Sequence, residues 1–439
     1  MTWRILASPG RNIKTGIGLA AQRVGMNSAW LLMARVVVQV QALLLTVLIA
    51  RRLGEAGFGQ YTLIASLIFL GNVFTTFGTD TLLIRQIAQS RRADGPELSA
   101  ALVLQVALSF LFTGGIWLWT AFLPQSSADF ISGLRLYSLS LFPLAFTSIY
   151  TAAWRGYERM DLYLAASLGT AGVQLIAIWL ALKMGSGLPA LMGVLLAVQV
   201  FTMLISYAFC KAGLPAFAIH WRIPQPALAQ ILRIALPLAI LSILGVAYQR
   251  LGVFTLSYLG SDVLTGLFSA ASRVVEALKL GHIAVLGALF PALSGLNKPM
   301  QINKLSTQEA AALFRRVFWG LLALGLAGAV GAALFAHPLI SLLYGTRYSA
   351  AEPALRVLAW LLVPYSLSAV LTVAMISQGR EKMVAVALAS SLVFGLLLNF
   401  LWVPIWGLLG ACLSAVAAES LQAGVLVVFY IRRQKIAQK

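Results

Sequence analysis

The chain has 439 residues, of which 60% are hydrophobic and only 10% are charged, and its mean hydropathy is +0.89. A soluble protein of this length could not bury so much apolar surface, so the composition excludes a soluble globular protein and indicates a polytopic membrane protein. The net charge of +19 does not indicate a nucleic-acid partner, because the basic residues gather in short loops between apolar segments.

Apolar segments long enough to cross a bilayer as helices recur along the whole chain. We expect an all-α fold of twelve transmembrane helices, over residues 28–50, 61–84, 98–123, 134–154, 162–184, 188–210, 231–257, 263–290, 313–336, 354–376, 383–404 and 407–431. The expected organisation is a cytoplasmic N-terminal segment (1–27), an N-lobe (28–210), a cytoplasmic linker (211–230), a C-lobe (231–431) and a cytoplasmic basic tail (432–439). The N-terminal segment is polar and basic, which does not fit a cleavable signal peptide.

Lys and Arg are unevenly distributed between the two sides that these spans define. Most of them lie on the side of the two termini, and far fewer lie in the loops of the opposite side. The positive-inside rule therefore predicts a multi-pass protein of the cytoplasmic (inner) membrane with both termini in the cytoplasm. An even number of spans independently puts both termini on one side.

The two halves of the chain resemble each other. Residues 53–61 resemble 259–268, Leu134-Arg135 with Pro143 recurs as Leu355-Arg356 with Pro364, and residues 156–159 recur as 379–382. Both copies enter the membrane in the same direction, so we expect two six-helix lobes related by a parallel pseudo-twofold repeat about the membrane normal. The alternative is a chance similarity between apolar segments.

The span over residues 263–290 is the most highly charged, since it contains Arg273, Glu276, Lys279 and His282. A charged side chain near the bilayer centre costs roughly 2.5–3.5 kcal/mol, so these groups need partners, water or a ligand. At about 100° per residue, Arg273 and Glu276 lie on neighbouring turns and are able to pair. Two interpretations stay open. Either this is an internal ion pair, with Lys279 and His282 reaching the cytoplasmic interface, or Arg273 faces a wet central cavity and attracts an anionic substrate.

Further cations and amides lie inside other spans. Arg35 and Gln39 are four residues apart on one helical face, and Arg35 either faces the cavity or extends to the cytoplasmic headgroups. Arg250 lies in the second half of its span. We therefore hypothesise a ladder of cations from inside to outside, formed by Arg35, Arg273 and Arg250. Together with Gln39 and Lys279 these residues are the predicted substrate-binding set.

Three acids within the spans, Asp80, Glu276 and Glu419, are candidates for ion coupling, and a structural hydrogen-bonded role is the alternative for Glu419. No nucleotide-binding loop is present, so ATP is not an expected driver. Membrane potential alone is a plausible driver, because moving one charge through 100 mV is worth roughly 2.3 kcal/mol. Cys210, Cys412 and the three histidines form no metal-ligand pattern. We expect no catalytic residues, no metal site and no cofactor.

Four sequence segments carry a resemblance to a known family. LIARRLGEAGFGQY at 48–61 resembles the first-loop signature of polysaccharide transporters, the Wzx-type oligosaccharide flippases of the multidrug/oligosaccharidyl-lipid/polysaccharide exporter superfamily. The resemblance continues with GLFSAASR at 266–273, LYGTRYSAA at 343–351 with LRVLA at 355–359, and GLLGA at 407–411 with Glu419, and it covers about residues 25–431. The family often has an Asp two residues after the arginine of span seven, where this chain has Gly252.

The resemblance implies a flippase that moves undecaprenyl-pyrophosphate-linked oligosaccharide repeat units from the inner to the outer leaflet, for O-antigen, capsule or exopolysaccharide assembly. Its implied partners are the lipid-linked oligosaccharide and membrane lipids, with polysaccharide polymerases as candidates and no nucleic acid. Alternating access with cations in a central cavity would solve the problem of passing pyrophosphate and sugar hydroxyls through hydrocarbon. The alternatives are an ion-coupled drug or cation antiporter, a lipid II flippase of the same superfamily, and a membrane-bound polymerase or ligase.

Overall fold

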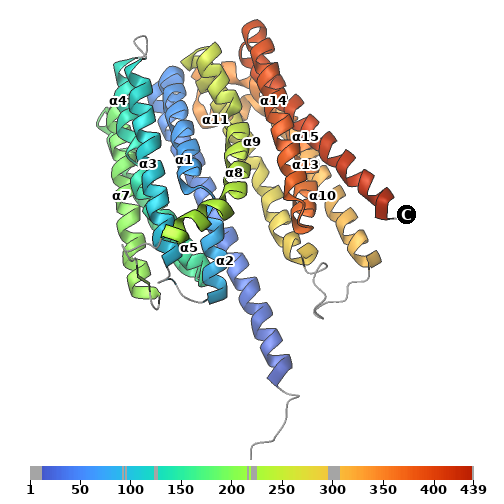
Figure 1. Cartoon of the computed structure of the whole chain (residues 1–439). Coiled ribbons are helices and arrows are strands. Elements are labelled where there is room, and N and C mark those ends of the chain that lie inside the picture. The colour runs from blue at the N-terminus through green and yellow to red at the C-terminus, as the bar shows by residue number, and fades with distance from the viewer. Residues whose placement is uncertain are drawn as a thin grey trace, which may run out of the picture.

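The computed structural model describes residues 12–90, 93, 96–122, 127–214, 217–218, 225–294 and 307–437. These residues are almost entirely α-helical, and the described part of the chain contains one isolated β-bridge, between Ala93 and Phe217, but no strand. The expected all-α fold is confirmed (Figure 1). Parts of the predicted domain scheme lie outside the described residues. They are 1–11 of the N-terminal segment, 91–92, 94–95 and 123–126 of the N-lobe, 215–216 and 219–224 of the linker, 295–306 of the C-lobe, and 438–439 of the tail.

The described first half of the chain forms seven helices. These are α1 (Asn12–Thr76), α2 (Thr79–Ser90), α3 (Pro96–Ala121), α4 (Ala128–Ser138), α5 (Leu141–Gly156), α6 (Met160–Lys183) and α7 (Leu188–Gly213). α1 is broken at Gly54, whose φ of 71° and ψ of −175° belong to a region that only glycine adopts freely. α2 follows α1 directly and lies at the same end of the molecule as the start of α1 (Figure 1), so the chain turns back at Gly54.

The described second half forms eight α-helices and one 3₁₀ helix. These are α8 (Gln225–Leu259), α9 (Asp262–Ser294), α10 (Thr307–Leu334), α11 (Ala336–Tyr344), η2 (Thr346–Ala351), α12 (Glu352–Ala359), α13 (Leu362–Ser377), α14 (Glu381–Trp406) and α15 (Leu408–Ala437). We call the end of the molecule at which α1 turns at Gly54 the upper end, as it is oriented in Figure 1, and the opposite end the lower end.

The helices account for the twelve predicted spans. Nine segments of the described chain are long and apolar enough to cross a membrane, and the bent pair of α12 and α13 makes a tenth. One of the nine, Met33–Thr76, has 44 residues and turns back at Gly54, so it crosses twice. α9 is the twelfth span, because its 33 residues are long enough to cross the membrane. Its composition alone does not identify it as a membrane span, since it contains Arg273, Glu276 and Lys279.

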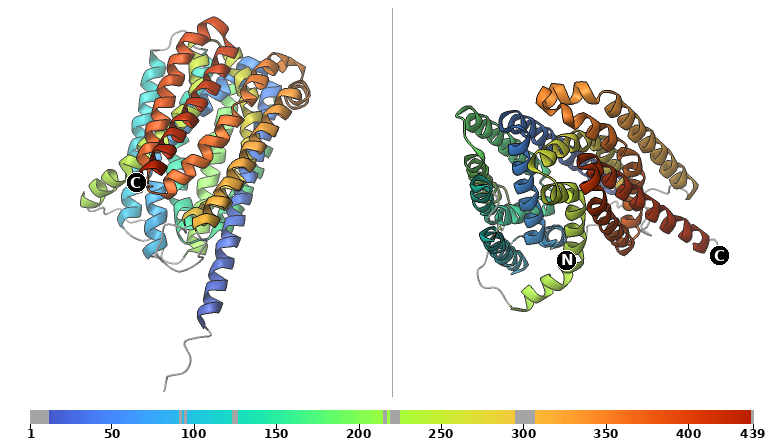
Figure 2. Two further views of the ribbon diagram at one scale, coloured as in Figure 1. Left: turned by 90° about the vertical axis from the view of Figure 1, so that its right-hand side faces the viewer. Right: turned by 90° about the horizontal axis from the view of Figure 1, so that it is seen from above.

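Seen from above, the helices of the first half gather on one side of the molecule and those of the second half gather on the other (Figure 2, right). Each lobe contains one broken span at the equivalent place. α4 ends at Ser138 and α5 resumes at Leu141 in the first lobe, while α12 ends at Ala359 and α13 resumes at Leu362 in the second. These breaks coincide with the Leu-Arg and Pro repeat of the sequence, and the two-lobe repeat is confirmed.

The apolar core divides differently at the two ends of the molecule. At the upper end one continuous cluster joins both lobes and includes Ile49, Phe58, Leu267, Tyr348 and Leu355. Toward the lower end the clusters are separate. One cluster lies in the N-lobe and is built from α2, α3, α5 and α7 with the first turns of α8, and two smaller ones lie in the C-lobe. The lobes are therefore joined by apolar packing mainly at the upper end.

α8 passes from one lobe to the other. Ile231 belongs to the lower cluster of the N-lobe, and Leu238 lies against Gly78 at the start of α2. Pro237 lies inside the helix at this point and removes one backbone hydrogen bond. Beyond it, Val253 and Leu256 join the cluster that connects both lobes, which brings Arg250 to the boundary between them.

Candidate functional site

Two arginines from neighbouring helices converge on one carboxylate. Arg273 donates a 2.7 Å hydrogen bond from Nη1 to Oε2 of Glu276, three residues further along α9. Arg250 of α8 donates from Nη1 to the other oxygen, Oε1, at 3.4 Å. The three side chains are 20%, 15% and 29% exposed for Arg273, Arg250 and Glu276. They form a partly accessible group with a net charge of +1.

This cluster lies near the middle of the membrane-spanning region. Arg273 and Glu276 follow the start of α9 at Asp262 by 11 and 14 residues, which at 1.5 Å per residue is roughly 17–21 Å from the upper end. The hydrocarbon core is about 30 Å thick. The pairing with Glu276 offsets the cost of holding two guanidinium groups at this depth, and the excess positive charge leaves the site attractive to an anion.

Side chains from the N-lobe complete the surroundings of the arginines. The Phe69 ring of α1 lies 5.4 Å from Cζ of Arg250, in a cation–π contact across the lobe boundary. Tyr61 of α1 and Tyr344 of α11 are buried and lie close enough to Arg273 to interact electrostatically. The Tyr344 hydroxyl and Nε of Arg250 are both buried, and neither has a hydrogen-bond partner among the described residues.

Lys279 and His282 of α9 have partners of their own on α13. Lys279 lies over the ring of Tyr365 of α13, with Nζ 4.4 Å from its centroid. His282 is 1% exposed, and its Nε2 lies 2.7 Å from the hydroxyl of Ser366. Of the two interpretations left open, the one in which His282 reaches the cytoplasmic interface is wrong for this residue, because a partner on α13 holds the imidazole inside the C-lobe.

The expected internal Arg273–Glu276 pair is present, but the predicted ladder of cations is not. Arg250 and Arg273 share one carboxylate and lie side by side, because α8 and α9 are antiparallel neighbours that meet at this level. Arg35 is exposed and Gln39 half-buried in the lower part of α1. Neither side chain forms a hydrogen bond or an ion pair with another described residue. Arg35 and Gln39 are therefore not part of the arginine cluster.

The predicted coupling acids lie in three different places. Glu419 of α15 is 5% exposed, and its two oxygens accept hydrogen bonds from Ser368 of α13 and, at 2.9 Å, from Tyr248 of α8. Asp80 is half-buried in the first turn of α2 and accepts a long 3.4 Å bond from Thr81. Glu276 belongs to the arginine cluster. Glu419 is thus a buried, fully hydrogen-bonded carboxylate inside the C-lobe.

Polar and backbone contacts close the upper end above the site. Gly59 of α1 and Gly266 of α9 touch so closely that a Cβ on Gly59 would lie 1.9 Å from the Asp262 carbonyl oxygen, and one on Gly266 would lie 2.1 Å from the Glu55 carbonyl oxygen. Only glycine permits this approach. Gln60 donates a 2.8 Å hydrogen bond to Asp262 across the same contact.

Two further contacts tie α1 to the C-lobe at this level. Arg51 donates from Nε to the carbonyl of Leu343 at 2.8 Å and from Nη2 to the carbonyl of Leu342. The Tyr348 hydroxyl donates to the carbonyl of Ala50 at 3.1 Å. Phe58 packs against Tyr344 and Tyr348, with ring centroids 6.5 and 6.3 Å away. Together with the glycine contact these residues form what we call the upper seal: Ala50, Arg51, Phe58, Gly59, Gln60, Asp262, Gly266, Leu342, Leu343, Tyr344 and Tyr348.

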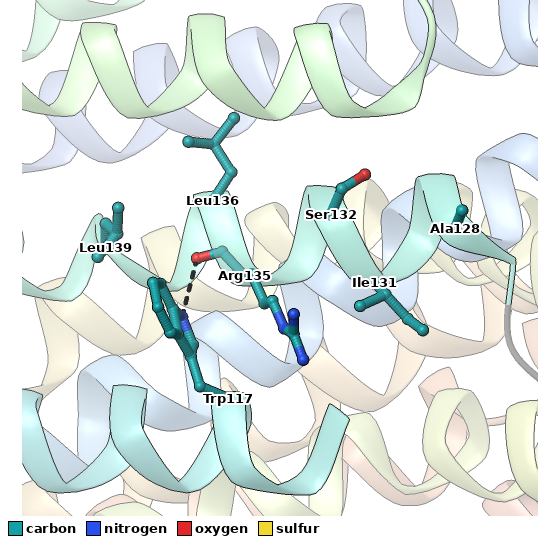
Figure 3. Close-up of a pocket in the computed structure, with 7 residues that line it drawn as sticks. All are labelled: Trp117, Ala128, Ile131, Ser132, Arg135, Leu136 and Leu139. Atoms are coloured by element: carbon teal, nitrogen blue, oxygen red, sulfur yellow. Dashed lines mark hydrogen bonds between the residues drawn. The ribbon is translucent and has the colours of Figure 1, made fainter. Parts of the chain in front are cut away.

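A separate groove of about 580 Å³ opens at the upper end of the N-lobe, between α3 and α4 (Figure 3). Arg135 lines it and donates from Nε to Thr120 at 2.8 Å, while Trp117 donates from Nε1 to the Arg135 carbonyl at 3.4 Å. The groove is lined by residues of the N-lobe alone. We do not assign the transport site to it.

The described chain contains no group of three His, Cys, Asp or Glu side chains that could hold a metal ion. Cys210 and Cys412 are free and buried. The chemistry that the arginine cluster offers is charge neutralisation and hydrogen-bond donation toward an anion, because guanidinium groups donate but do not accept.

The comparison with known families gives a decisive match. The sequence matches the profile of the family described as polysaccharide biosynthesis protein over residues 24–297, which is more than half of the chain. The chain belongs to this family. No match was found among curated protein sequences.

Solved structures with the same fold are transporters of the multidrug/oligosaccharidyl-lipid/polysaccharide exporter (MOP) superfamily. An inward-facing multidrug resistance MATE family transporter of this superfamily has a TM-score of 0.74 at 16% identity, covering 92% of this chain and 95% of that one. An outward-facing structure of such a transporter gives 0.67 at 16% identity, covering 95% and 96%. A MOP superfamily transporter from Pyrococcus furiosus, described as having a binding pocket of reverse polarity, gives 0.68 at 15%, covering 95% and 96%.

At these identities the likeness shows the fold alone, which is that of membrane transporters of the MOP superfamily. The resemblance to polysaccharide transporters inferred from the sequence segments is thereby confirmed. The segment over residues 48–61, which carried that resemblance, supplies much of the upper seal, namely Ala50, Arg51, Phe58, Gly59 and Gln60.

Sequence reasoning missed the aromatic and hydroxyl partners of the site. Phe69 and Tyr344 contribute to the surroundings of the arginines, and Tyr248 and Ser368 hold Glu419. Of these residues only Tyr248 could have been suspected from the sequence, because it lies two residues before Arg250 on α8. The others come from elements far away in the chain and were not distinguishable from ordinary residues of apolar helices.

Proposed function

We propose that this protein is a flippase that moves polyprenyl-pyrophosphate-linked oligosaccharides from the inner to the outer leaflet for cell-surface polysaccharide assembly. The observation that carries the proposal is the convergence of Arg250 and Arg273 at mid-membrane depth, at the boundary between two lobes of a transporter fold. Guanidinium groups are well suited to phosphate because they donate parallel hydrogen bonds and keep their charge. Membership of the polysaccharide biosynthesis protein family supports a glycan as cargo.

We infer that the lower end faces the cytoplasm and that the protein lies in the inner membrane with both termini inside. Described basic residues at the lower end outnumber those at the upper end, as the positive-inside rule requires. The upper seal then lies on the outer side, and this conformation is the one that takes substrate from the inner leaflet. The higher TM-score to the inward-facing than to the outward-facing MATE structure, 0.74 against 0.67, supports the same assignment.

In this mechanism the pyrophosphate binds at the arginines, the sugars pass between the lobes, and the polyprenyl tail stays in lipid. Opening of the upper seal and closure of the lower end would carry the headgroup across. The chain's own contribution is binding and reorientation, and no bond of the substrate is broken. The family and fold are those of transporters, which argues against a polymerase or ligase.

The test of the proposal is deletion of the gene, followed by analysis of lipid-linked sugars and of surface polysaccharide. We expect polyprenyl-linked repeat units to accumulate inside the cell and surface glycan to be lost. Complementation with the wild-type gene should restore both. Normal surface glycan in the deletion strain, with no accumulated lipid-linked sugar, would reject the flippase.

The second candidate is an ion-coupled antiporter for drugs or cations. It is favoured by the buried, hydroxyl-bound Glu419 in the C-lobe and by the multidrug transporters that share the fold. This candidate predicts that the deletion strain becomes sensitive to cationic drugs while its surface glycan stays normal. The excess of arginines over acids in the central cluster disfavours it, because a cationic cargo would be repelled.

Glu419 is also the acid that we expect to couple flipping to an ion gradient. If it does, Glu419→Gln should abolish the dependence of export on pH or on sodium, with the protein present at a normal level. The same substitution at Glu381, an exposed acid in the first turn of α14, is the control. Unchanged export across a range of pH and sodium would assign Glu419 to a purely structural role.

A further inference from the structure

Glu276 occupies the position where an anionic cargo would meet the arginines. Both of its oxygens are used, Oε2 by Arg273 and Oε1 by Arg250, so the carboxylate bridges two helices. A carboxylate with 29% exposure is neither sealed in the core nor free in solvent, and it can be reached from outside the cluster. Any anion that binds both arginines has to compete with it.

The two contacts of Glu276 are unequal. The bond to Arg273 measures 2.7 Å and joins residues on consecutive turns of the same helix, so it persists however α8 and α9 move. The bond to Arg250 measures 3.4 Å and joins different helices. Charge-assisted N–H···O bonds are strong at about 2.7–2.9 Å, so the Arg250 contact is the weaker one.

Arg250 also has unused capacity to donate. Its Nε is buried without a hydrogen-bond partner among the described residues, and the buried Tyr344 hydroxyl near the cluster is in the same situation. Phe69 of the N-lobe lies against the Arg250 guanidinium, so this arginine contacts both lobes. The environment of Arg250 therefore changes when the lobes move relative to each other, as does that of Arg273, which lies near Tyr61 of α1.

We propose that Glu276 is a resident occupant of the anion site, and that the cargo's pyrophosphate displaces it from Arg250 while it stays paired with Arg273. This inference rests on the proposed function. A pyrophosphate offers more charge and more acceptor oxygens than a carboxylate, so it satisfies the spare donors that Glu276 leaves unpaired. When the cargo leaves, Glu276 returns to Arg250.

The exchange has two consequences. The arginines are never left without a counter-ion at mid-membrane depth, which would be costly. Binding is also weakened by the work of displacing Glu276, so the cargo can be released on the outer side. The device favours a pyrophosphate-linked cargo over a phosphodiester with a single charge, because a singly charged anion gains little over the carboxylate that it replaces.

The experiment measures binding of inorganic pyrophosphate to the purified full-length protein in lipid nanodiscs by calorimetry. The informative variant is Glu276→Asp, which keeps the negative charge next to Arg273 but is too short to reach Arg250. We expect it to bind pyrophosphate about tenfold more tightly than the wild type, since the competing charge-assisted hydrogen bond is gone. Adding Arg250→Gln should remove that gain.

Glu276→Gln and Glu381→Gln separate displacement from a general change in charge. Both remove one negative charge, but only the first removes the charged partner of Arg250, because Glu381 is an exposed acid at the start of α14. We expect Glu276→Gln to raise the affinity and Glu381→Gln to leave it unchanged. An equal increase in the two variants, an unchanged affinity in Glu276→Asp, or no pyrophosphate binding in any of the proteins would overturn the inference. If binding behaves as expected but the deletion strain exports glycan normally, the flippase proposal fails and the exchange stands.

Discussion

The upper and lower halves of this molecule are held together in different ways. In the upper half one apolar cluster runs through both lobes, and Gly59 and Gly266 bring two helix backbones into contact. In the lower half the two lobes have separate apolar clusters, and the first turns of α8 connect them, because Ile231 packs in the N-lobe cluster and Leu238 lies against Gly78. The same two six-helix lobes thus share one core at one end and are linked through α8 at the other.

This difference shows where the molecule can move. Close packing of apolar side chains and backbone resists gradual separation, because a gap of about 0.5–1 Å already loses a quarter to a half of the contact energy. The upper seal is therefore a joint with two discrete states, closed or open. The arginine cluster lies below it, so opening the seal would change which side reaches Arg250 and Arg273.

The largest effect should come from the arginine cluster itself. We expect Arg273→Gln to abolish glycan export and to destabilise the protein by roughly 3 kcal/mol, because it leaves Glu276 with only its long bond to Arg250. The double variant Arg273→Gln with Glu276→Gln should recover much of the thermal stability, measured by unfolding in detergent, but not export. Export by the double variant at a normal protein level would show that the cations are structural only.

The second prediction breaks the joint at its closest point. Gly266→Val should hold the upper end open and cost roughly 1–3 kcal/mol, because a Cβ would lie 2.1 Å from the Glu55 carbonyl oxygen. The measurement is labelling of a cysteine introduced at Ser269, which is 2% exposed on α9, by a membrane-impermeant thiol reagent added outside cells. The matched control is Gly169→Val on α6, where nothing lies within 4 Å of the added Cβ. Equal labelling in the two variants would mean that the glycine contact does not close the upper end.

A smaller effect is expected from the polar part of the seal. Arg51→Ala removes two hydrogen bonds to the carbonyls of Leu342 and Leu343, which at an exposed site should contribute about 0.5–1.5 kcal/mol together. We expect a modest rise in the same external labelling. Arg52→Ala is the control, since Arg52 is also exposed and makes no such contact in the described structure. If the two variants are labelled to the same extent, the rise in labelling comes from the change in net charge and not from the lost hydrogen bonds.

The smallest effect should follow Tyr348→Phe, which removes a single hydroxyl. Its 3.1 Å bond to the Ala50 carbonyl is lost while the ring contacts with Phe58 and Tyr344 remain. We expect a loss of about 0.5–1.5 kcal/mol in the free energy of unfolding and nearly normal export. Severe loss of export would show that the hydroxyl has a role beyond the seal.

Much of the fold was predictable from the sequence. The twelve spans follow from runs of apolar residues, and the repeat of Leu-Arg with Pro indicated the two like halves, although the breaks at α4–α5 and α12–α13 were not predicted. The pairing of Arg273 with Glu276 was also predictable, because residues three apart on one helix are neighbours whatever surrounds them. Each of these features depends on local spacing.

The composition of the site was less predictable. Arg250 joins Glu276 from 26 residues away, and Glu419 finds Tyr248 and Ser368 at separations of 171 and 51 residues. The sequence placed Arg250 and Arg273 at different depths, since their distances from the span ends were uncertain by several residues. Such an uncertainty shifts a side chain by about 1.5 Å per residue, enough to separate two partners.

The sequence by itself determined the membrane environment, the helices, the twofold repeat and the family. Hydrophobicity and helical spacing act locally, and they are the same in any packing. Only the tertiary structure decided that the lobes meet at Gly59 and Gly266, that α8 begins on the N-lobe, and that two arginines share one carboxylate. These contacts depend on how the helices are rotated and shifted against each other. The apolar pattern of a membrane helix does not specify this rotation and shift, which are determined by close packing of the side chains.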